Sequence, residues 1–367
     1  MILMNDFRAE PLALLKETQV AVRRVLESGW YVLGNEVLTF ERAWAVRCGT
    51  LSGIGVGNGM DAIEIALRGL DIGPGDEVIT TSMTAFATVL AIIRAGATPV
   101  LADIEGDTGL MSLESVKRCL SKNTKAILLV HLYGQVRNMP GWQMFCRNHG
   151  LVLLEDCAQA HLAAQGGRIA GSFGVAGAYS FYPTKNLGAI GDGGMLVTSS
   201  ESLAERSRRL RNYGQSVRYE HPELGLNSRL DEIQAAILSV RLNWLDEFTQ
   251  RRKEIAKRYQ FEIQNTHIVQ LALPQELTAH VYHLYVIKCE RRDQLQSYLQ
   301  TKGIQTHIHY PIPIHKQTPC LALRRDSLGL PHTEVHAETC LSLPCHPAMT
   351  DRDVSLVIAS VNDFMKT

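Results

Sequence analysis

Between Leu51 and Ser199, short apolar runs alternate with amphipathic stretches, and this pattern narrows the possible folds more than anything else in the sequence. Short apolar runs bounded by Gly, Pro and Asp favour buried strands, and strands that alternate with helices form a largely parallel sheet covered on both faces. Ligands bind at the carboxyl ends of the strands in such a sheet. Strands are predicted at Gly53–Val56, Glu77–Thr80, Thr98–Ala102, Ala126–His131, Leu151–Glu155, Ala176–Phe181 and Gly194–Thr198. Helices are predicted at Asp61–Gly69, Ala87–Ala95, Ser112–Leu120 and Met139–Asn148.

A long helical pattern follows this region and runs from Arg229 to Gln264, with one break predicted along it. We interpret it as the connection between two domains. Residues 1–245 are predicted to form a large domain with an N-terminal arm, and residues 246–367 the bridging helix and a small C-terminal α+β domain. Within the small domain, a strand is predicted at His280–Cys289 and a helix at Gln294–Lys302.

The overall composition excludes several classes of protein. Lys and Arg number 37 and so do Asp and Glu, which leaves no basic field for a nucleic-acid backbone. The sequence contains no run of about 18 apolar residues, and charged residues interrupt its first 16, so neither a membrane span nor a signal peptide is predicted. The eight cysteines are scattered without a CxxC pair and are expected to be reduced thiols. We therefore predict a cytoplasmic protein without membrane or nucleic-acid partners.

One lysine stands where a strand end meets a glycine-rich turn. Lys185 follows the small-residue run Val175–Ser180, and the turn Gly191–Gly194 precedes the last predicted strand. Burial beside the core of the sheet lowers the pKa of a lysine from about 10.4 and makes its neutral amine available. Schiff-base chemistry requires a neutral amine. The alternative is an ordinary surface lysine at a strand end.

An acidic residue follows another strand of the same predicted sheet. Asp156 comes directly after Leu151–Glu155, at the edge where parallel strands present their ligands. A carboxylate there can hold a pyridine nitrogen protonated, so that the ring accepts electrons. Gln159 and His161 continue the same turn and are candidates to approach such a ring. The alternative for Asp156 is the cap of a following helix.

A glycine turn between a strand and a helix, Gly55–Asp61, offers a site for an anion. Free N–H groups at the start of a helix, aided by the helix dipole, suit a phosphate. The pattern alone is weak because it is not a GxxxxGK[ST] loop, but the hydroxyl of Ser180 is a candidate for a further phosphate contact. A phosphate nest, an aspartate and a lysine at three strand ends are together what pyridoxal phosphate requires.

The motifs around these residues resemble those of the DegT/DnrJ/StrS sugar aminotransferases, and the resemblance covers nearly the whole chain. They are Ser28–Gly34, Gly57–Asp61, Val130–Gln135, Glu155–His161, Ser180–Gly188, Gly191–Gly194, Arg211–Gly214 and Gly225–Ala236. The resemblance implies an aspartate-aminotransferase-like (type I) fold with pyridoxal 5'-phosphate bound by the large domain. It also implies a homodimer with the cofactor at the subunit interface.

By this resemblance, Lys185 is the lysine that bonds to the cofactor, Asp156 pairs with the pyridine nitrogen and Gln159 approaches the ring. Family members commonly carry an aromatic residue where this chain has Ala85. The group that stacks on the ring therefore stays open between Phe86, after a local shift, and another side chain. Those family dehydratases that carry histidine at the position of Lys185 cannot bond to the cofactor in this way, so the lysine excludes that one group of relatives.

The resemblance likewise assigns the contacts to the cofactor phosphate. The turn at Gly59 presents the backbone amides of Met60 and Asp61, and Ser180 binds through its hydroxyl. Asn227 would reach the phosphate of the neighbouring subunit. The residues that bind each cofactor phosphate are thus expected to come from both subunits.

The loop 305–315, rich in His and Pro, is similar to loops of family members that act at C3 of dTDP-linked 3-keto-6-deoxyhexoses. By this similarity His309 and Tyr310 face the sugar, and prolines fix the loop. Tyr31 is a further candidate for substrate binding by analogy, and Arg229 is a candidate cation for the nucleotide diphosphate.

A metal site is the alternative use of the histidines in this loop. His307, His309 and His315 are close in sequence, but no carboxylate or cysteine stands nearby at ligand spacing. No metal is therefore predicted.

The sequence as a whole predicts an aminotransferase that moves an amino group from L-glutamate to a nucleotide-linked ketosugar. The expected substrate is a dTDP-3-keto-6-deoxyhexose, which becomes the 3-amino sugar. The alternatives are a 4-keto substrate, another pyridoxal-phosphate enzyme such as a dehydratase, and a regulatory protein that keeps the fold without turnover. Lys185 and Asp156 argue against the last alternative, because a binding module has no need of a Schiff base.

Overall fold

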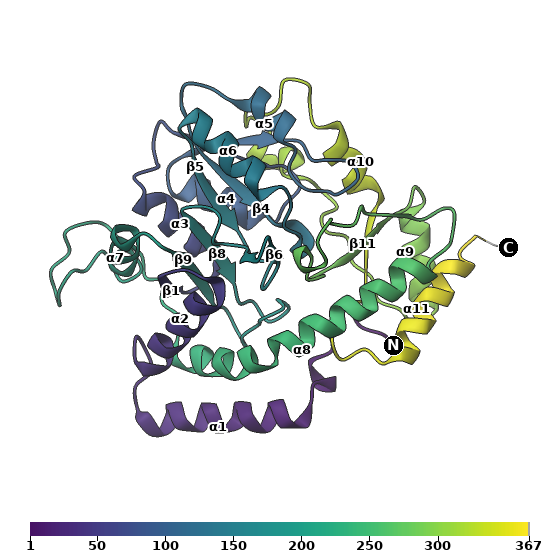
Figure 1. Ribbon diagram of the computed structural model, residues 1–367, viewed down its shortest axis with the longest axis horizontal. Coiled ribbons are helices and arrows are strands. Elements are labelled where there is room, and N and C mark those ends of the chain that lie inside the picture. The colour runs from purple at the N-terminus through teal and green to yellow at the C-terminus, as the bar shows by residue number, and fades with distance from the viewer. Residues whose placement is uncertain (366–367) are drawn as a thin grey trace.

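A seven-stranded sheet lies at the centre of the large domain in the computed structural model, which describes residues 1–365 (Figure 1). Its strands are ordered β1-β9-β8-β5-β4-β2-β3, and every pair is parallel except those of β9, which is antiparallel to both neighbours. The strands are β1 (Ser52–Val56), β2 (Glu77–Thr81), β3 (Thr98–Ala102), β4 (Thr124–Val130), β5 (Val152–Asp156), β8 (Ala176–Ser180) and β9 (Gly194–Thr198). Each strand predicted in this region is present with small shifts at its ends, and the largely parallel mixed sheet is confirmed.

Helices cover both faces of this sheet. On one face α3 packs with α4 and α7, and on the other α2, α5 and α6 pack with the first half of α8. The helices of the large domain are α1 (Leu12–Ser28), α2 (Asn35–Cys48), α3 (Gly59–Gly69), α4 (Phe86–Arg94), α5 (Leu113–Cys119), α6 (Met139–His149) and α7 (Glu201–Leu210). The strands between these layers are nearly continuous apolar runs because both of their faces are buried.

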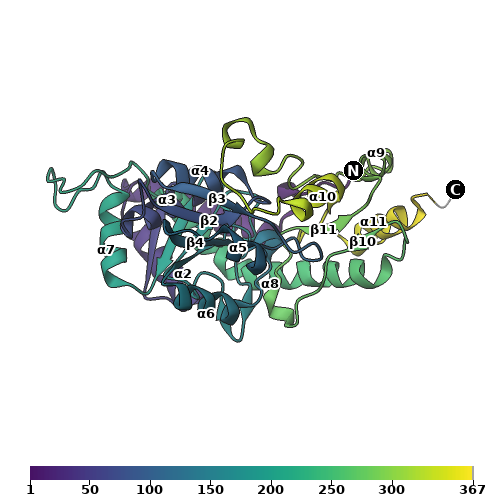
Figure 2. The same ribbon diagram turned by 90° about the horizontal axis from the view of Figure 1, so that it is seen from above.

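A single helix, α8 (Glu232–Glu262), joins the large domain to the small one (Figures 1 and 2). The predicted break in this helix is wrong, since the structure shows one continuous helix. Its sequence contains neither Gly nor Pro, and what changes along it is the core against which the helix packs. Leu238 belongs to the core of the large domain, whereas Tyr259 belongs to that of the small domain. The predicted domain boundary after residue 245 falls inside α8 and stays a prediction.

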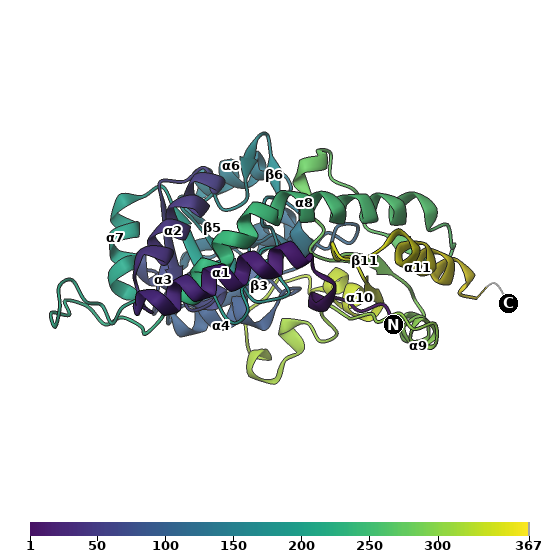
Figure 3. The ribbon, with the colours of Figure 1, turned by 90° about the horizontal axis from the view of Figure 1, so that it is seen from below.

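The N-terminal helix α1 lies along the first half of α8 on the outside of the molecule (Figure 3). Arg241 on α8 donates from Nη1 to Glu10 Oε2 over 2.9 Å, and Trp244 Nε1 donates to Glu17 Oε2 over 3.0 Å.

None of the described helices is long and apolar enough to cross a membrane.

The small domain is built on an antiparallel sheet in the order β10-β11-β12. Its elements are β10 (Val269–Gln270), β11 (Tyr285–Lys288), β12 (Cys340–Leu343), α9 (Arg292–Thr301), α10 (Pro331–Thr339) and α11 (Asp351–Asp363). The predicted strand at His280–Cys289 is only partly correct. Its first residues contact the large domain instead, through a bridge between His280 and Gln135 and a bond from Val281 N–H to Gly134 O of 3.0 Å.

Short elements complete the chain. They are β6 (Ala164–Gln165), β7 (Arg168–Ile169) and 3-10 turns at Phe7–Ala9, Leu132–Gly134, Leu277–Ala279, Ile314–Lys316 and Thr318–Cys320. The turn Leu132–Gly134 follows β4, so it lies at the carboxyl edge of the central sheet, where ligands are expected.

Candidate active site

The predicted lysine lies in the turn that follows β8. Lys185 is largely buried, and its backbone N–H donates to Tyr182 O over 2.8 Å. Burial lowers the pKa of Lys185 to about 8, although the nearby carboxylate of Asp156 acts in the opposite direction. The pKa has therefore moved in the direction that the sequence predicts for a lysine beside the sheet core.

The carboxylate of Asp156 is held at the last residue of β5 and is only 5% exposed. Its Oδ2 accepts from the Thr88 hydroxyl over 2.8 Å, and its Oδ1 accepts from Ala158 N–H over 3.1 Å. Both oxygens of the carboxylate are therefore hydrogen-bonded within the chain. Thr88 in α4 also contacts the hydroxyl of Thr84, which precedes the helix, over 2.9 Å, so a short chain of hydroxyls at the start of α4 supports Asp156.

Thr88 was not among the predicted site residues. Its role depends on a contact with a strand 68 positions further along the chain. The one local signal is that Thr84 and Thr88 stand only four positions apart, on either side of the start of α4.

The predicted anion site lies at the start of α3. Asn58 caps the helix, and its side-chain oxygen accepts from Asp61 N–H over 2.9 Å. The Asp61 amide is thus occupied by the cap, while the amides of Gly59 and Met60 lie in the first turn, where partners within the helix are lacking. Ser228, another residue that sequence reasoning missed, donates from its hydroxyl to Asp61 Oδ2 over 2.7 Å and fixes this turn.

The start of α3 approaches the ends of β8 and β9 so closely that two positions require glycine. A Cβ on Gly59 would lie 2.7 Å from Ser180 Cβ, and one on Gly194 would lie 2.3 Å from the backbone of Asn58. The approach brings the amides of the helix start next to Ser180. These residues fit pyridoxal phosphate: amides and a hydroxyl suit its phosphate, Asp156 its ring nitrogen and Lys185 its carbonyl carbon.

The small domain contributes the predicted sugar-facing residues on the other side of Asp156. Gln159 Nε2 donates to Tyr310 Oη over 3.3 Å, and His309 Nδ1 pairs with the Ser342 hydroxyl over 2.8 Å. Burial, reinforced by His307, lowers the pKa of His309 to about 4, so its imidazole is neutral near pH 7. The structure therefore brings His309 and Tyr310 to the predicted cofactor residue Gln159.

His161, a candidate to approach the cofactor ring, lies among aromatic side chains. It is completely buried, and its ring centroid lies 5.7 Å from that of Trp44, 5.3 Å from that of Tyr179 and 5.8 Å from that of Phe181. Burial, with a smaller effect of Lys185, lowers the pKa of His161 to about 3. Aromatic packing thus encloses His161 beside Lys185, and its approach to the cofactor ring stays a prediction.

Two predicted residues lie in the segment that follows α7. Asn227 is exposed and pairs with Asn212 in a short antiparallel bridge. Arg229 Nη1 donates to Asn212 Oδ1 over 3.2 Å, and the Arg229 guanidinium stands 5.2 Å from the centre of the Tyr213 ring. Among the described residues, their contacts stay within this segment and do not include Lys185 or Asp156.

Large apolar side chains are exposed around the site. Tyr182 is 52% exposed and Ile190 60% exposed, on either side of Lys185. Tyr31 and Phe86 are also exposed, and Phe86 is the first residue of α4, after Ala85. The cofactor-stacking role of Phe86 and the substrate role of Tyr31 stay predictions.

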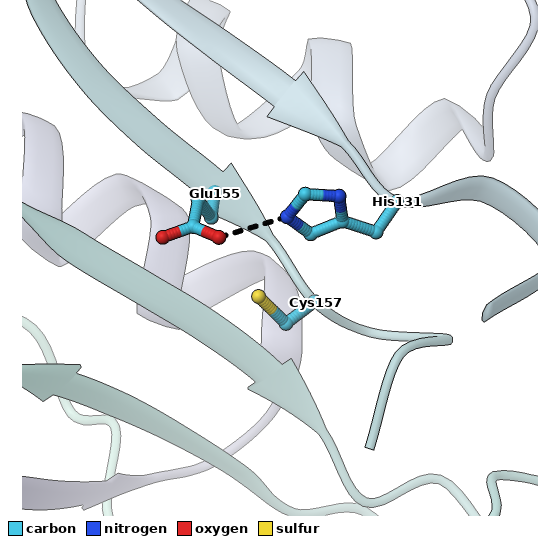
Figure 4. A group of neighbouring side chains, drawn as sticks. All are labelled: His131, Glu155 and Cys157. Atoms are coloured by element: carbon cyan, nitrogen blue, oxygen red, sulfur yellow. Dashed lines mark hydrogen bonds and ion pairs between the residues drawn. The ribbon is translucent and has the colours of Figure 1, made fainter. Parts of the chain in front are cut away.

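A buried group of His131, Glu155 and Cys157 beside the site has the spacing of metal ligands (Figure 4). The Glu155 carboxylate, however, accepts from His131 Nε2 over 2.8 Å and from the backbone N–H groups of residues 171, 173 and 174 over 2.7 to 2.8 Å. Four donors saturate its two oxygens. Burial also raises the pKa of the Cys157 thiol well above its ordinary value, which opposes metal ligation. We interpret the group as a hydrogen-bond network that fixes the loop before β8.

The fold and the site together define a class. A lysine, an aspartate and a helix start at neighbouring strand ends are the parts of a pyridoxal-phosphate enzyme of the aspartate-aminotransferase type. The chain belongs to the DegT/DnrJ/EryC1/StrS aminotransferase family, whose sequence profile matches residues 13–362. Members of this family are pyridoxal-phosphate-dependent enzymes.

Similar proteins agree with this assignment. The chain is 46% identical, over 99% of both sequences, to the dTDP-3-amino-3,6-dideoxy-alpha-D-galactopyranose transaminase of Aneurinibacillus thermoaerophilus. It is 42% identical to the dTDP-3-amino-3,4,6-trideoxy-alpha-D-glucose transaminase of Streptomyces venezuelae, over 98% of this chain and 95% of that protein. The crystal structure of S. venezuelae DesV in complex with a ketimine intermediate matches with a TM-score of 0.96 and 41% identity, over 100% of this chain and 99% of the other. The chain is therefore a sugar transaminase.

We predict that the cofactor-free protein reacts with pyridoxal phosphate faster as the pH rises through about 8, because only the neutral amine of Lys185 attacks a carbonyl carbon. The visible absorbance of the product measures the rate, and Lys185→Ala shows no such band. In Asp156→Asn the profile moves to lower pH, because the carboxylate that favours the ammonium form is gone. A profile centred on 10.5, the ordinary lysine value, would contradict this assignment.

Proposed function

We propose that this transaminase uses pyridoxal phosphate to move an amino group from L-glutamate to C3 of a dTDP-3-keto-6-deoxyhexose. The observation that carries the proposal is the largely buried Lys185, with its lowered pKa, between Asp156 and the start of α3. The two curated relatives described above are named for dTDP-linked 3-amino sugars, which supports the sugar class and the position of the new amine.

When bound, pyridoxal phosphate supplies a carbonyl carbon that amines attack and a ring that accepts electrons. Lys185 moves protons at its Nζ, since a pKa of about 8 lets it both accept and release a proton near neutral pH. Asp156, fixed by Thr88, holds the ring nitrogen protonated through its carboxylate. The amides at the start of α3 and the hydroxyl of Ser180 bind and orient the phosphate.

His309 and Tyr310 bind the sugar in this proposal. A sugar presents hydroxyl groups that need both donors and acceptors, and a neutral histidine and a tyrosine offer both. Ser342 fixes the ring of His309, and Gln159 fixes the hydroxyl of Tyr310. Loops of this kind select substrates because they hold polar groups at set positions on a rigid scaffold.

The nucleotide diphosphate is bound by Arg229 and approached by Tyr31 in this proposal. The chain has no net charge, so cations for a diphosphate must be few and local. Arg229 already has its guanidinium oriented by Asn212 and by the ring of Tyr213, which lowers the entropy lost when a diphosphate binds.

A homodimer completes the site in this proposal. Exposed apolar side chains such as Tyr182 and Ile190 flank Lys185, and such a patch on a protein surface marks an interface. The segment after α7 projects from the body of the molecule (Figures 1 and 3), and Asn227 pairs with Asn212 at the base of this segment. Such an arm suits a contact with the second chain, where Asn227 would reach its phosphate.

We place the enzyme in the cytoplasm. All eight cysteines are free and buried, as expected of thiols that stay reduced inside cells. The predicted substrates are biosynthetic sugar nucleotides, which an intracellular enzyme can reach.

The substrate assignment predicts a clear preference in an assay with L-glutamate and a panel of nucleotide ketosugars. The value of kcat/KM for a dTDP-3-keto-6-deoxyhexose should exceed that for its 4-keto isomer by on the order of 100-fold, because a polar site rejects a misplaced carbonyl. Mass spectrometry and NMR identify the amino sugar. A preference for the 4-keto isomer would overturn the position, and an eliminated or decarboxylated product would overturn the reaction.

His309→Ala should slow the half-reaction with the sugar by about tenfold or more, because a buried polar contact to the substrate is lost. The half-reaction with glutamate should change little. Stopped-flow absorbance of the cofactor separates the two. His307→Ala is the matched control, since this neighbouring histidine is exposed. Equal loss in both half-reactions would mean that the loop supports the cofactor rather than the sugar.

Mixed dimers test the shared site. One chain carries Lys185→Ala and the other Asn227→Ala, so that each homodimer is impaired. If Asn227 serves the opposite subunit, the mixed dimer regains one intact site, and its activity should return to about half of the wild-type value per dimer. Activity that is not restored would place Asn227 in its own subunit, and an active monomer in light scattering would contradict the dimer.

A further inference from the structure

Tyr133 is a buried tyrosine that contacts both the cofactor side and the sugar side of the site. It lies in the turn Leu132–Gly134 and is only 2% exposed. Its backbone N–H donates to Gln159 Oε1 over 2.6 Å, and its hydroxyl donates to the backbone carbonyl of His309 over 2.6 Å. Tyr133, a residue of the large domain, thus holds Gln159 on the cofactor side and His309 on the sugar side of the site.

The direction of the bonds at the Tyr133 hydroxyl follows from its single proton. This proton goes to the His309 carbonyl, so the oxygen accepts from His336 Nε2, which is 2.8 Å away. The two rings are stacked, with centroids 5.9 Å apart. Burial, with a smaller effect of Lys288, lowers the pKa of His336 to about 4, which leaves a neutral ring with its proton on Nε2. The result is a buried chain from His336 through Tyr133 to His309, in which each bond strengthens the next.

These contacts form a closed ring of hydrogen bonds that includes the sugar-facing residues His309 and Tyr310. Tyr133 binds Gln159 through its backbone, Gln159 binds the hydroxyl of Tyr310, and Tyr310 is joined to His309, whose carbonyl returns to Tyr133. The bond between His309 and Ser342 then leaves His309 fixed at both its backbone and its ring. Removal of the Tyr133 hydroxyl would leave the carbonyl of His309 with only a weak bond from the Cys340 thiol, whose Sγ lies 3.7 Å away, while every side chain that faces the ligands is retained.

We propose that Tyr133 is a positioning residue for the sugar half-reaction, which sets where His309 and Tyr310 stand relative to the cofactor residue Gln159. The proposal rests on the proposed function, because it assigns the sugar to this loop. It also implies that Tyr133 acts through the loop 305–315 and has no contact of its own with either substrate.

The test is Tyr133→Phe, which keeps the ring and its packing on His336 and removes only the hydroxyl. The sugar half-reaction should slow by about tenfold, as expected when a well-placed hydrogen bond is lost. The glutamate half-reaction should stay within about twofold of wild type. Tyr259→Phe is the matched control, since that buried hydroxyl donates to Pro344 O over 2.7 Å in the core of the small domain. It should leave both half-reactions unchanged even where it lowers the melting temperature.

A double-mutant cycle tests whether Tyr133 acts through the loop. If it does, adding Tyr133→Phe to Tyr310→Phe should slow the sugar half-reaction by clearly less than the product of the two single effects, because coupled residues are not additive. Fully multiplicative effects would overturn the positioning role.

Two variants of His336 decide the matter even if Tyr133→Phe does not fold. His336→Gln keeps an N–H donor for the Tyr133 hydroxyl and should retain the wild-type sugar half-reaction, while His336→Met, of similar size, should slow it. Equal effects of the two substitutions, or a loss shared by the glutamate half-reaction, would overturn the proposal. Failure of the proposed function is distinct, because wild-type enzyme would then load an amino group from glutamate and transfer it to no nucleotide 3-ketosugar.

Discussion

The close packing of the α3 start against the ends of β8 and β9 is the contact on which the rest of the site depends. Gly59 and Gly194 leave no space for a side chain there, so the capped helix start lies directly beside Ser180. Lys185 follows Ser180 by one short turn, and Asp156 ends the adjacent strand β5. The anion site, the amine and the carboxylate therefore have fixed relative positions before any ligand binds, and burial at this edge then lowers the pKa of Lys185.

Sequence alone predicts those parts of the fold and site whose signals are local. The strands of the large sheet were found because burial on both faces leaves short apolar runs. Asp156 was singled out because it ends such a run, and Lys185 because it lies in the short turn after one. Contacts between distant segments leave no such signal. Ser228 meets Asp61 across 167 positions, and Tyr133 meets His309 across 176. The break predicted in α8 was wrong for a related reason, since a change of packing partner along a helix looks like an interruption.

The small domain takes part in the site through the residues next to the lysine as well as through the loop 305–315. Asn186 Nδ2 donates to Val281 O over 3.1 Å, and Asn186 Oδ1 faces His283 Nδ1 at 3.2 Å. The chain segment before β11 is thereby tied to the turn that carries Lys185. Burial, reinforced by the charge of Lys185, holds the pKa of His283 well below its ordinary value, so this ring adds no positive charge beside the lysine. The small domain thus contributes a neutral group next to the buried amine.

The uninterrupted course of α8 has a mechanical consequence. A helix of 31 residues that is anchored in both cores behaves as a stiff beam, so the two domains cannot swing about a hinge at their boundary without bending it. Loops rather than domain rotation must then adapt the site to the sugar and to the amino acid. Family members can diverge toward new sugars by changes in the loop 305–315, while α8 preserves the distance between the large and the small domain.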